Sequence, residues 1–235
     1  MWEERASDKH EIEYIMSIDV DEPDSLGYAT NTKIIKESKK FNTLVLVNEN
    51  RSIVDAVNRG AHAATGDMLV VMSDDFECPP NWDYVLQTAV EFFGNSEYLI
   101  MVDDCVPVHQ KLDICTLPVL SRSWFQKYGY VYYPEYFSMF CDNDMTLRAK
   151  RDHVLLDVRH LISFQHNHFI CGRNPKDETY TRETNADAFR DGEILLNTRV
   201  ASGFVDTCGN CETFATMYGK SLHRIPQNGT TPTRT

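Results

Sequence analysis

Residues 68–82 read MLVVMSDDFECPPNW. Its first five residues are apolar, and Ser73 then leads into two adjacent carboxylates, Asp74 and Asp75. In a strand over 68–72 the apolar side chains point to both faces, which is typical of a strand in the middle of a mostly parallel sheet covered by helices. The stretch therefore predicts an α/β fold with two acidic side chains at the carboxyl end of a central strand.

Strand and helix patterns alternate on both sides of this strand. Apolar runs predict further strands, and apolar side chains at helical spacing predict helices. Strands separated by helices indicate right-handed βαβ units, which build a three-layer α/β/α sandwich with a mostly parallel central sheet. The expected strands are 12–18, 43–47 and 98–102, and the expected helices are 29–40, 51–64 and 81–93.

The second half of the chain is less regular. Aromatic residues crowd 124–140, where they suit either a protein core or stacking on sugar rings. Because no linker is visible, we expect one domain over residues 1–226, followed by a disordered polar tail, 227–235. The elements expected here are a helix over 142–151, strands over 154–158 and 161–168, and a helix over 186–202.

The composition narrows the class of protein. The 235 residues carry a net charge of −12, which argues against nucleic acid or an anionic membrane as the partner. No run approaches the roughly 18 apolar residues that span a bilayer, and the N-terminus lacks the apolar core of a signal peptide. Seven scattered cysteines indicate reduced thiols and a cytoplasmic protein. The close pair Cys208 and Cys211 lacks the further ligands that a structural zinc site needs.

Asp74 and Asp75 have two interpretations. Ligands of open α/β sheets bind beyond the carboxyl ends of the strands, and paired carboxylates there suit Mg²⁺ or Mn²⁺ bound to nucleotide phosphates. The alternative is a polar turn, or an N-cap for the helix that starts near Pro80.

Two histidines form a second candidate site. His166 and His168 point to the same face if 161–168 is a strand, and the preceding residues on that face are apolar. This arrangement suits a metal ligand or an anion contact. Histidine pairs also pack and hydrogen-bond without a metal, so both interpretations stay open.

A third acidic group opens the predicted helix 142–151. Asp142 lies at its expected N-cap, where the helix dipole keeps a carboxylate ionised and able to act as a general base. A plain N-cap explains Asp142 as well. Asp144 can pair with Arg148 at i,i+4, which is a structural role.

In this order, the motifs resemble those of GT-A glycosyltransferases, specifically family 2. The resemblance covers roughly residues 12–204 and rests on a combination of segments rather than on any one of them. The matching segments are Asn58 to Asp67, the strand with Asp74-Asp75, Pro79-Pro80-Asn-Trp82, and Asp142 to Ala149.

The resemblance implies a metal-dependent, inverting transfer of a sugar to an acceptor hydroxyl of a glycan or another molecule. The expected donor is a nucleotide-diphosphate sugar, with a UDP-sugar as the first choice. Asp75 would hold Mn²⁺ or Mg²⁺ with His168 or His166, and Asp142 would be the catalytic base. The nucleotide would contact Asp19, Asp21, Arg51, Ser73 and Asp74, and the acceptor would contact Trp124 and Cys141. Asp21 suits an exposed acidic turn equally well. Arg51 suits a solvated position at the start of a helix as well as a phosphate contact.

Three features depart from the family pattern. Ser73 replaces the first Asp of the metal motif, and Cys141 replaces the Glu before the catalytic Asp. The strand that usually opens the domain has no counterpart before residue 12. We therefore keep three alternatives: a piece of the domain is missing, a partner chain or oligomer supplies that strand, or the protein is a binding or assembly protein that has lost catalysis. A nucleotidyltransferase is weaker, because no Gly-rich phosphate loop is visible.

Overall fold

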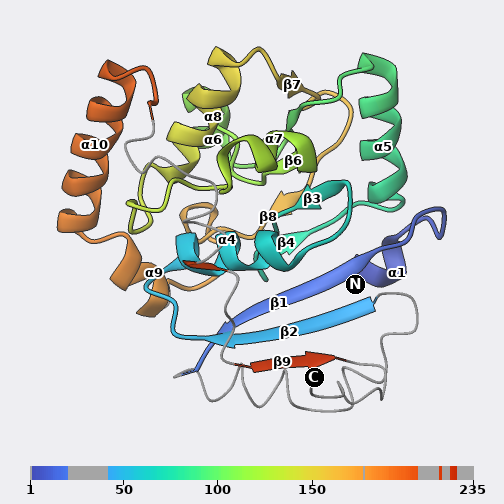
Figure 1. The fold of residues 1–235 in the computed structure, drawn as a ribbon, viewed down its shortest axis with the longest axis horizontal. Coiled ribbons are helices and arrows are strands. Elements are labelled where there is room, and N and C mark those ends of the chain that lie inside the picture. The colour runs from blue at the N-terminus through green and yellow to red at the C-terminus, as the bar shows by residue number, and fades with distance from the viewer. Residues whose placement is uncertain (1, 21–41, 177, 206–216, 219–222, 227–235) are drawn as a thin grey trace.

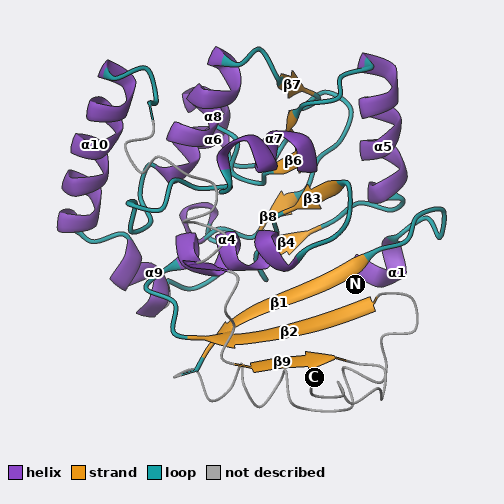
Figure 2. Cartoon of the chain, viewed as in Figure 1, coloured by secondary structure: helices purple, strands orange, loops and turns teal. Residues whose placement is uncertain are grey.

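The computed structural model describes residues 2–20, 42–176, 178–205, 217–218 and 223–226. These residues form an α/β fold with mixed sheets (Figure 1, Figure 2). No helix in these ranges is long and apolar enough to cross a membrane. Four predicted features lie outside the described residues: the helix 29–40, Asp21, the pair Cys208 and Cys211, and the tail 227–235.

The first sheet lies along one side of the molecule, below α4 (Ile53–Ala63) in Figure 1. Its first two strands are parallel, and the third is antiparallel to the second. Ser52 caps α4 by accepting a hydrogen bond from the backbone N–H of Val54 (3.3 Å), as serine commonly does before a helix. The strands are β1 (Glu13–Asp19), β2 (Asn42–Asn48) and β9 (His223–Pro226).

The second sheet contains the strand from the acidic stretch. Its strands, in spatial order, are β3 (Met68–Val70), β6 (Val119–Ser121), β5 (Leu99–Met101) and β7 (Leu155–Asp157). Only β5 and β7 are parallel, and β6 is antiparallel to both of its neighbours. Among the described strands β3 therefore lies at an edge, not in the centre of a mostly parallel sheet as the sequence predicted.

The physical reason for this difference is the cover on the two faces of β3. Leu69 belongs to one buried apolar cluster, whereas Met68 and Val70 pack against another. Apolar side chains on both faces of a strand show that both faces are covered. They do not show how many strands lie beside it, or in which direction those strands run.

Helices of very different length surround the sheets, with α5 and α10 at opposite ends of the view (Figure 2). The longer ones are α5 (Trp82–Phe93), α8 (Cys141–Arg151) and α10 (Ala186–Ala201), and these confirm the predicted helices. A segment of only a few residues is too short to show a clear periodicity. The sequence therefore did not predict the short elements. These are α6 (Pro107–Leu112), α7 (Arg122–Tyr128), α9 (Glu178–Glu183), the 3₁₀ helix η1 (Phe169–Cys171), β4 (Phe76–Glu77), β6 and β9. A further short helix, α1 (Trp2–Arg5), lies near the N-terminus.

Aromatic residues of the 124–140 stretch form the larger core cluster. Their rings surround Arg148, whose guanidinium carbon lies 4.9 Å from the ring centre of Trp124 and 4.6 Å from that of Tyr130. Arg148 pairs with Asp144 as the sequence predicted (Nε to Oδ1, 3.4 Å), and Asp144 also pairs with Arg199 of α10. The two arginines compensate the buried negative charge of Asp144. The pair with Arg199 also holds α8 to α10.

Candidate active site

The two aspartates of the acidic stretch lie in a turn between β3 and β4 (Phe76–Glu77). β4 pairs antiparallel with β8 (Gln165–His166), and this pairing places Phe76 opposite His166. As a result, Nε2 of His166 lies 2.9 Å from Oδ2 of Asp75. The hydroxyl of Ser73 donates a hydrogen bond to the other carboxylate oxygen of Asp75. Ser73, the departure from the family pattern, therefore orients the carboxylate that follows it.

A second carboxylate, Asp104, approaches His166 from the other side. The backbone N–H of His166 donates to the carbonyl of Asp104 (3.1 Å), which fixes the two segments to each other. Oδ1 of Asp104 accepts from the backbone N–H of Val106 (3.0 Å). Its Oδ2 accepts from the hydroxyl of Thr116 (2.7 Å) and lies 2.5 Å from Nδ1 of His109.

Asp104 and His109 are not among the residues predicted from the sequence. One sequence feature could have pointed to Asp104. Asp103 and Asp104 follow the apolar strand 98–102, much as Asp74 and Asp75 follow the strand at 68–72. His109 carries no such pattern, because it enters the site only through the short helix α6, which places it five residues after Asp104.

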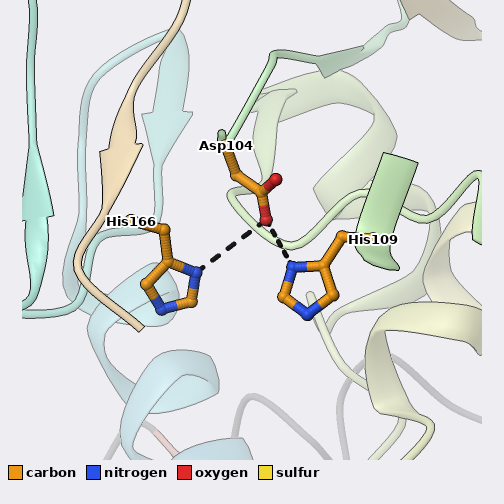
Figure 3. A group of neighbouring side chains, drawn as sticks. All are labelled: Asp104, His109 and His166. Atoms are coloured by element: carbon orange, nitrogen blue, oxygen red, sulfur yellow. Dashed lines mark hydrogen bonds and ion pairs between the residues drawn. The ribbon is translucent and has the colours of Figure 1, made fainter. Parts of the chain in front are cut away.

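Figure 3 shows the rings of His109 and His166 on either side of Asp104, each with a nitrogen facing the same carboxylate oxygen. Nδ1 of His166 is 3.8 Å from that oxygen. This nitrogen is buried and has no hydrogen-bond partner within the part of the chain that the structure describes. One possible ligand atom from each of the three residues lies within 4.8 Å of the others, so the group could hold a metal ion.

Hydrogen bonds, including those of His166, keep the carboxyl groups of Asp75 and Asp104 ionised. Burial alone would raise the pKa of Asp75, but His166 and Ser73 lower it below its usual value. Burial likewise opposes ionisation of Asp104, yet His109 and His166 hold its pKa far below the usual range. For His166, burial lowers the pKa, and the two carboxylates outweigh this and raise it.

His168 lies outside the strand that the sequence predicted for it. β8 ends at His166, and His168 instead precedes η1, where its Nδ1 accepts a hydrogen bond from the backbone N–H of Ile170 (3.2 Å). The two imidazole rings still pack together, with ring centres 4.8 Å apart and nearly perpendicular planes. Burial, followed by the nearby charge of His166, lowers the pKa of His168. A neutral ring with Nδ1 as acceptor carries its proton on Nε2, so in this arrangement His168 is a donor.

A cavity of about 270 Å³ opens beside the acidic turn. The ammonium group of Lys176 lies near it, 5.4 Å from the ring centre of Tyr180. Anionic and cationic side chains thus line one hollow, which suits a ligand that binds through both a metal ion and phosphate oxygens. The lining residues are Asp74, Asp75, Asn167, His168, Phe169, Asn174, Pro175, Lys176 and Tyr180. A larger cavity, about 380 Å³, lies beside α10 and is lined by none of these residues.

Asp142 lies in the first turn of α8, but it is not the N-cap that the sequence predicted. The helix begins one residue earlier, at Cys141. Its N-cap is Phe140, whose backbone is left-handed (φ 69°). Oδ1 of Asp142 accepts from the backbone N–H of Asn143 (2.8 Å). Burial raises the pKa of Asp142, and the charge of His109 is close enough to lower it in part. Asp142 is therefore within electrostatic reach of His109.

Asp19 and Arg51, which the sequence assigned to the nucleotide, both have hydrogen-bond partners within the protein. Asp19 ends β1 as expected, and its Oδ1 accepts from the amide of Asn50 (2.5 Å). Arg51 is engaged with Asp55 (Nε to Oδ2, 2.7 Å) and with the carbonyl of Pro134, so its guanidinium is already paired.

Trp124 and Cys141 belong to the core rather than to an acceptor site. Trp124 is 1% exposed and its indole N–H donates to Asp152 (3.0 Å), while Cys141 is 6% exposed. Neither side chain offers a surface to an acceptor, and this corrects the sequence-based expectation. The alternative that these aromatic residues form the core holds for Trp124.

One comparison with known proteins gives a match. The family model described as glycosyl transferase family 2 matches residues 13–155, which is more than half of the chain. The match includes the acidic turn, Asp104, His109 and Asp142, whereas His166 and His168 lie after it. No curated protein and no solved structure matches the chain.

Proposed function

The chain belongs to glycosyl transferase family 2, a family of glycosyltransferases, and we propose that it moves a sugar from a nucleotide-diphosphate donor to an acceptor hydroxyl. The proposed reaction depends on a divalent ion and inverts the configuration at the anomeric carbon. The observation that carries this proposal is the cavity where Asp74, Asp75, His168 and Lys176 meet. We propose a UDP-sugar as the donor and a glycan as the acceptor.

The residues of the acidic turn fit a divalent ion. Asp75 is ionised, oriented by Ser73 and His166, and open to the cavity together with Asp74. Carboxylate oxygens are the ligands that Mg²⁺ and Mn²⁺ prefer, and a nucleotide diphosphate and water commonly fill the other positions. Such an ion would neutralise the charge that develops on the departing diphosphate.

Several side chains of this chain would act on the donor directly. His168 would donate its Nε2–H to a phosphate oxygen, since its Nδ1 is engaged by Ile170. Lys176 would place a positive charge beside the same diphosphate. We assign Asp74 to the nucleotide side of the cavity, and Asp19 and Asp21 to the nucleobase.

For the fold as a whole we infer the three-layer GT-A sandwich. The parallel pairs β1–β2 and β5–β7 give this inference partial support.

Asp142 is the proposed catalytic base. In an inverting reaction the base removes the proton from the acceptor hydroxyl while that oxygen attacks the face of the sugar opposite the leaving diphosphate. A carboxylate whose pKa is raised by burial accepts this proton more readily than an exposed one. The charge of His109 would favour the ionised form of this base.

A transfer assay tests this function. The purified chain is supplied with Mn²⁺, a panel of nucleotide-diphosphate sugars and simple glycan acceptors, and release of the nucleoside diphosphate is followed. We expect turnover with one donor class, and a product whose anomeric configuration, read by NMR, is opposite to that of the donor. Glu193→Gln, an exposed change on α10, should turn over the donor at the same rate as the wild type. Retention of configuration would contradict the inverting mechanism, and consumption of no donor would favour the binding or assembly protein.

A further inference from the structure

The group formed by Asp104, His109 and His166 lies behind the acidic turn rather than in its cavity. Neither Asp104 nor His109 lines that cavity, whereas Asp75 does. The side chains of the three residues are largely buried, with exposed fractions of 5%, 15% and 12%. Their arrangement is therefore not explained by contact with a nucleotide, and it needs an explanation of its own.

The two ring nitrogens of His166 have different surroundings. Nε2 lies 2.9 Å from Oδ2 of Asp75. Nδ1 is buried, has no hydrogen-bond partner among the described residues, and faces Oδ2 of Asp104 across 3.8 Å. A buried polar atom without a partner is unfavourable, and a cation between Nδ1 and the carboxylate would give both atoms one.

We propose that Asp104, His109 and His166 bind a transition-metal ion of the Zn²⁺ class, separate from the ion of the nucleotide cavity. Two imidazole nitrogens and one carboxylate oxygen are a donor set that suits zinc and is unlike the all-oxygen sets of magnesium. Water would complete the coordination. The inference concerns these side chains alone and does not depend on sugar transfer.

The observed separations are compatible with such an ion. Zinc lies roughly 2.0–2.1 Å from nitrogen and oxygen ligands, so two ligands of a tetrahedral ion are about 3.4 Å apart. The two nitrogen-to-Oδ2 distances, 2.5 Å for His109 and 3.8 Å for His166, lie on either side of that value. The two separations would change by about 0.9 Å for His109 and about 0.4 Å for His166 on binding the ion.

The surrounding hydrogen bonds are those expected around a zinc ligand set. The other nitrogen of His166 donates to Asp75, which gives the carboxylate–histidine–metal arrangement common in zinc proteins. The hydroxyl of Thr116 fixes the ligating carboxylate of Asp104 (2.7 Å). The ion would thereby hold β8, α6 and the segment after β5 together, and would orient Asp75 from behind.

The test uses Zn²⁺ and Co²⁺ as probes on the full chain, with no nucleotide present. Metal is removed with a chelator, and binding is measured by calorimetry for Zn²⁺ and by visible absorption for Co²⁺, whose spectrum reports nitrogen ligation. We expect one ion per chain. His109→Gln and His166→Gln should each weaken binding by more than about 100-fold, which exceeds the 10–100-fold effect of losing an outer partner.

Two controls separate this site from others. His160→Ala removes an exposed histidine, and Asp74→Asn removes a carboxylate of the nucleotide cavity; both should leave zinc affinity within about 2-fold. Circular dichroism verifies that each variant is folded. The proposal is overturned if the wild-type chain binds no zinc at micromolar concentration, or if folded His109→Gln and His166→Gln bind it as the wild type does. If both variants fail to fold, a wild-type Co²⁺ spectrum without nitrogen ligation overturns it equally.

Discussion

Nε2 of His166 lies 2.9 Å from Oδ2 of Asp75, although 91 positions separate the two residues in the chain. The contact exists because β4 and β8 pair immediately after the acidic turn and place Phe76 against His166, whose rings stack with centres 4.1 Å apart. Asp75 is therefore an oriented and ionised carboxylate, not merely a polar residue in an exposed turn.

Asp75→Asn removes the charge of that carboxylate with little change of shape. We expect Mn²⁺-dependent nucleotide binding to weaken at least about 10-fold, because an amide is a much poorer ligand for a hard cation. Calorimetry with Mn²⁺ and a nucleoside diphosphate measures this. Glu91→Gln, an exposed change on α5, should bind as the wild type does. Unchanged binding in Asp75→Asn would place the ion elsewhere.

Asp142→Asn removes the proposed base. Transfer should fall by about 10²–10⁴-fold, the usual contribution of general-base catalysis, while nucleotide affinity stays within a few-fold of the wild type. Steady-state kinetics and calorimetry on the same preparation separate these two effects. Transfer at a normal rate in this variant would rule out Asp142 as the base.

The pH dependence of kcat/KM tests the same assignment independently. Asp142 is active as a base only when ionised, and burial raises its pKa above the ordinary value for aspartate. The rate should therefore fall as the pH drops, and this acid limb should lie above the usual aspartate range. A limb at or below that range would show that another group limits the rate.

Asp152 makes a pH-dependent contribution to stability. Although burial opposes its ionisation, hydrogen bonds from Tyr128 and Trp124 lower its pKa to about 2, from 3.8. A lowered pKa stabilises the folded state above pH 3.8, and this stabilisation is lost as the pH falls toward 2. Asp152→Asn should lower the free energy of unfolding by about 1–2 kcal/mol at pH 7, after allowing for solvent screening.

Denaturant unfolding at several pH values measures this contribution. The difference between the wild type and Asp152→Asn should shrink progressively between about pH 4 and pH 2, because the wild-type carboxyl group also becomes neutral there. A difference that stays constant with pH would show that the lost hydrogen bonds, rather than the charge, account for the effect.

Gly192 and Gly60 form a matched pair of helix glycines. A Cβ at Gly192 of α10 would lie 2.5 Å from the carbonyl oxygen of Met139, just before α8. A Cβ at Gly60 of α4 would meet only Cγ2 of Ile15, at 4.0 Å. Gly192→Ala should therefore destabilise the protein by about 1–3 kcal/mol. Gly60→Ala should stabilise it by up to about 1 kcal/mol, because alanine favours the helix.

Thermal and denaturant unfolding of both variants provide the comparison. Equal effects of the two substitutions would contradict the close approach of α10 to the loop before α8. Because that loop leads directly into the helix that carries Asp142, we also expect Gly192→Ala to lower transfer, whereas Gly60→Ala should not.

Much of the fold could be predicted from the sequence, because the longer elements carry a clear period. The strand expected at 12–18 and the helices expected at 81–93 and 186–202 are present within one or two residues. The pairing of the strands could not be predicted in this way. The position of β3 at an edge depends on β6, a three-residue strand too short to show any pattern.

The site was predictable only where neighbouring residues form a motif. Asp75 and His166 belong to recognisable stretches, and the structure brings them together. Asp104 is marked only by the apolar strand before it, and His109 by no motif, because the short helix α6 alone brings His109 to Asp104. The error at His168 has a similar cause: the strand ends at His166 because β4, its partner, is only two residues long.

Coupling between metal binding and nucleotide binding tests the proposed metal-dependent site. UDP is titrated into the chain by calorimetry with and without Mn²⁺, and Mn²⁺ is titrated with and without UDP. We predict that each ligand increases the affinity for the other, by the same factor in both orders, because thermodynamic linkage is reciprocal. Binding of neither ligand, or binding of each without any effect on the other, would show that this cavity is not a metal-dependent nucleotide site.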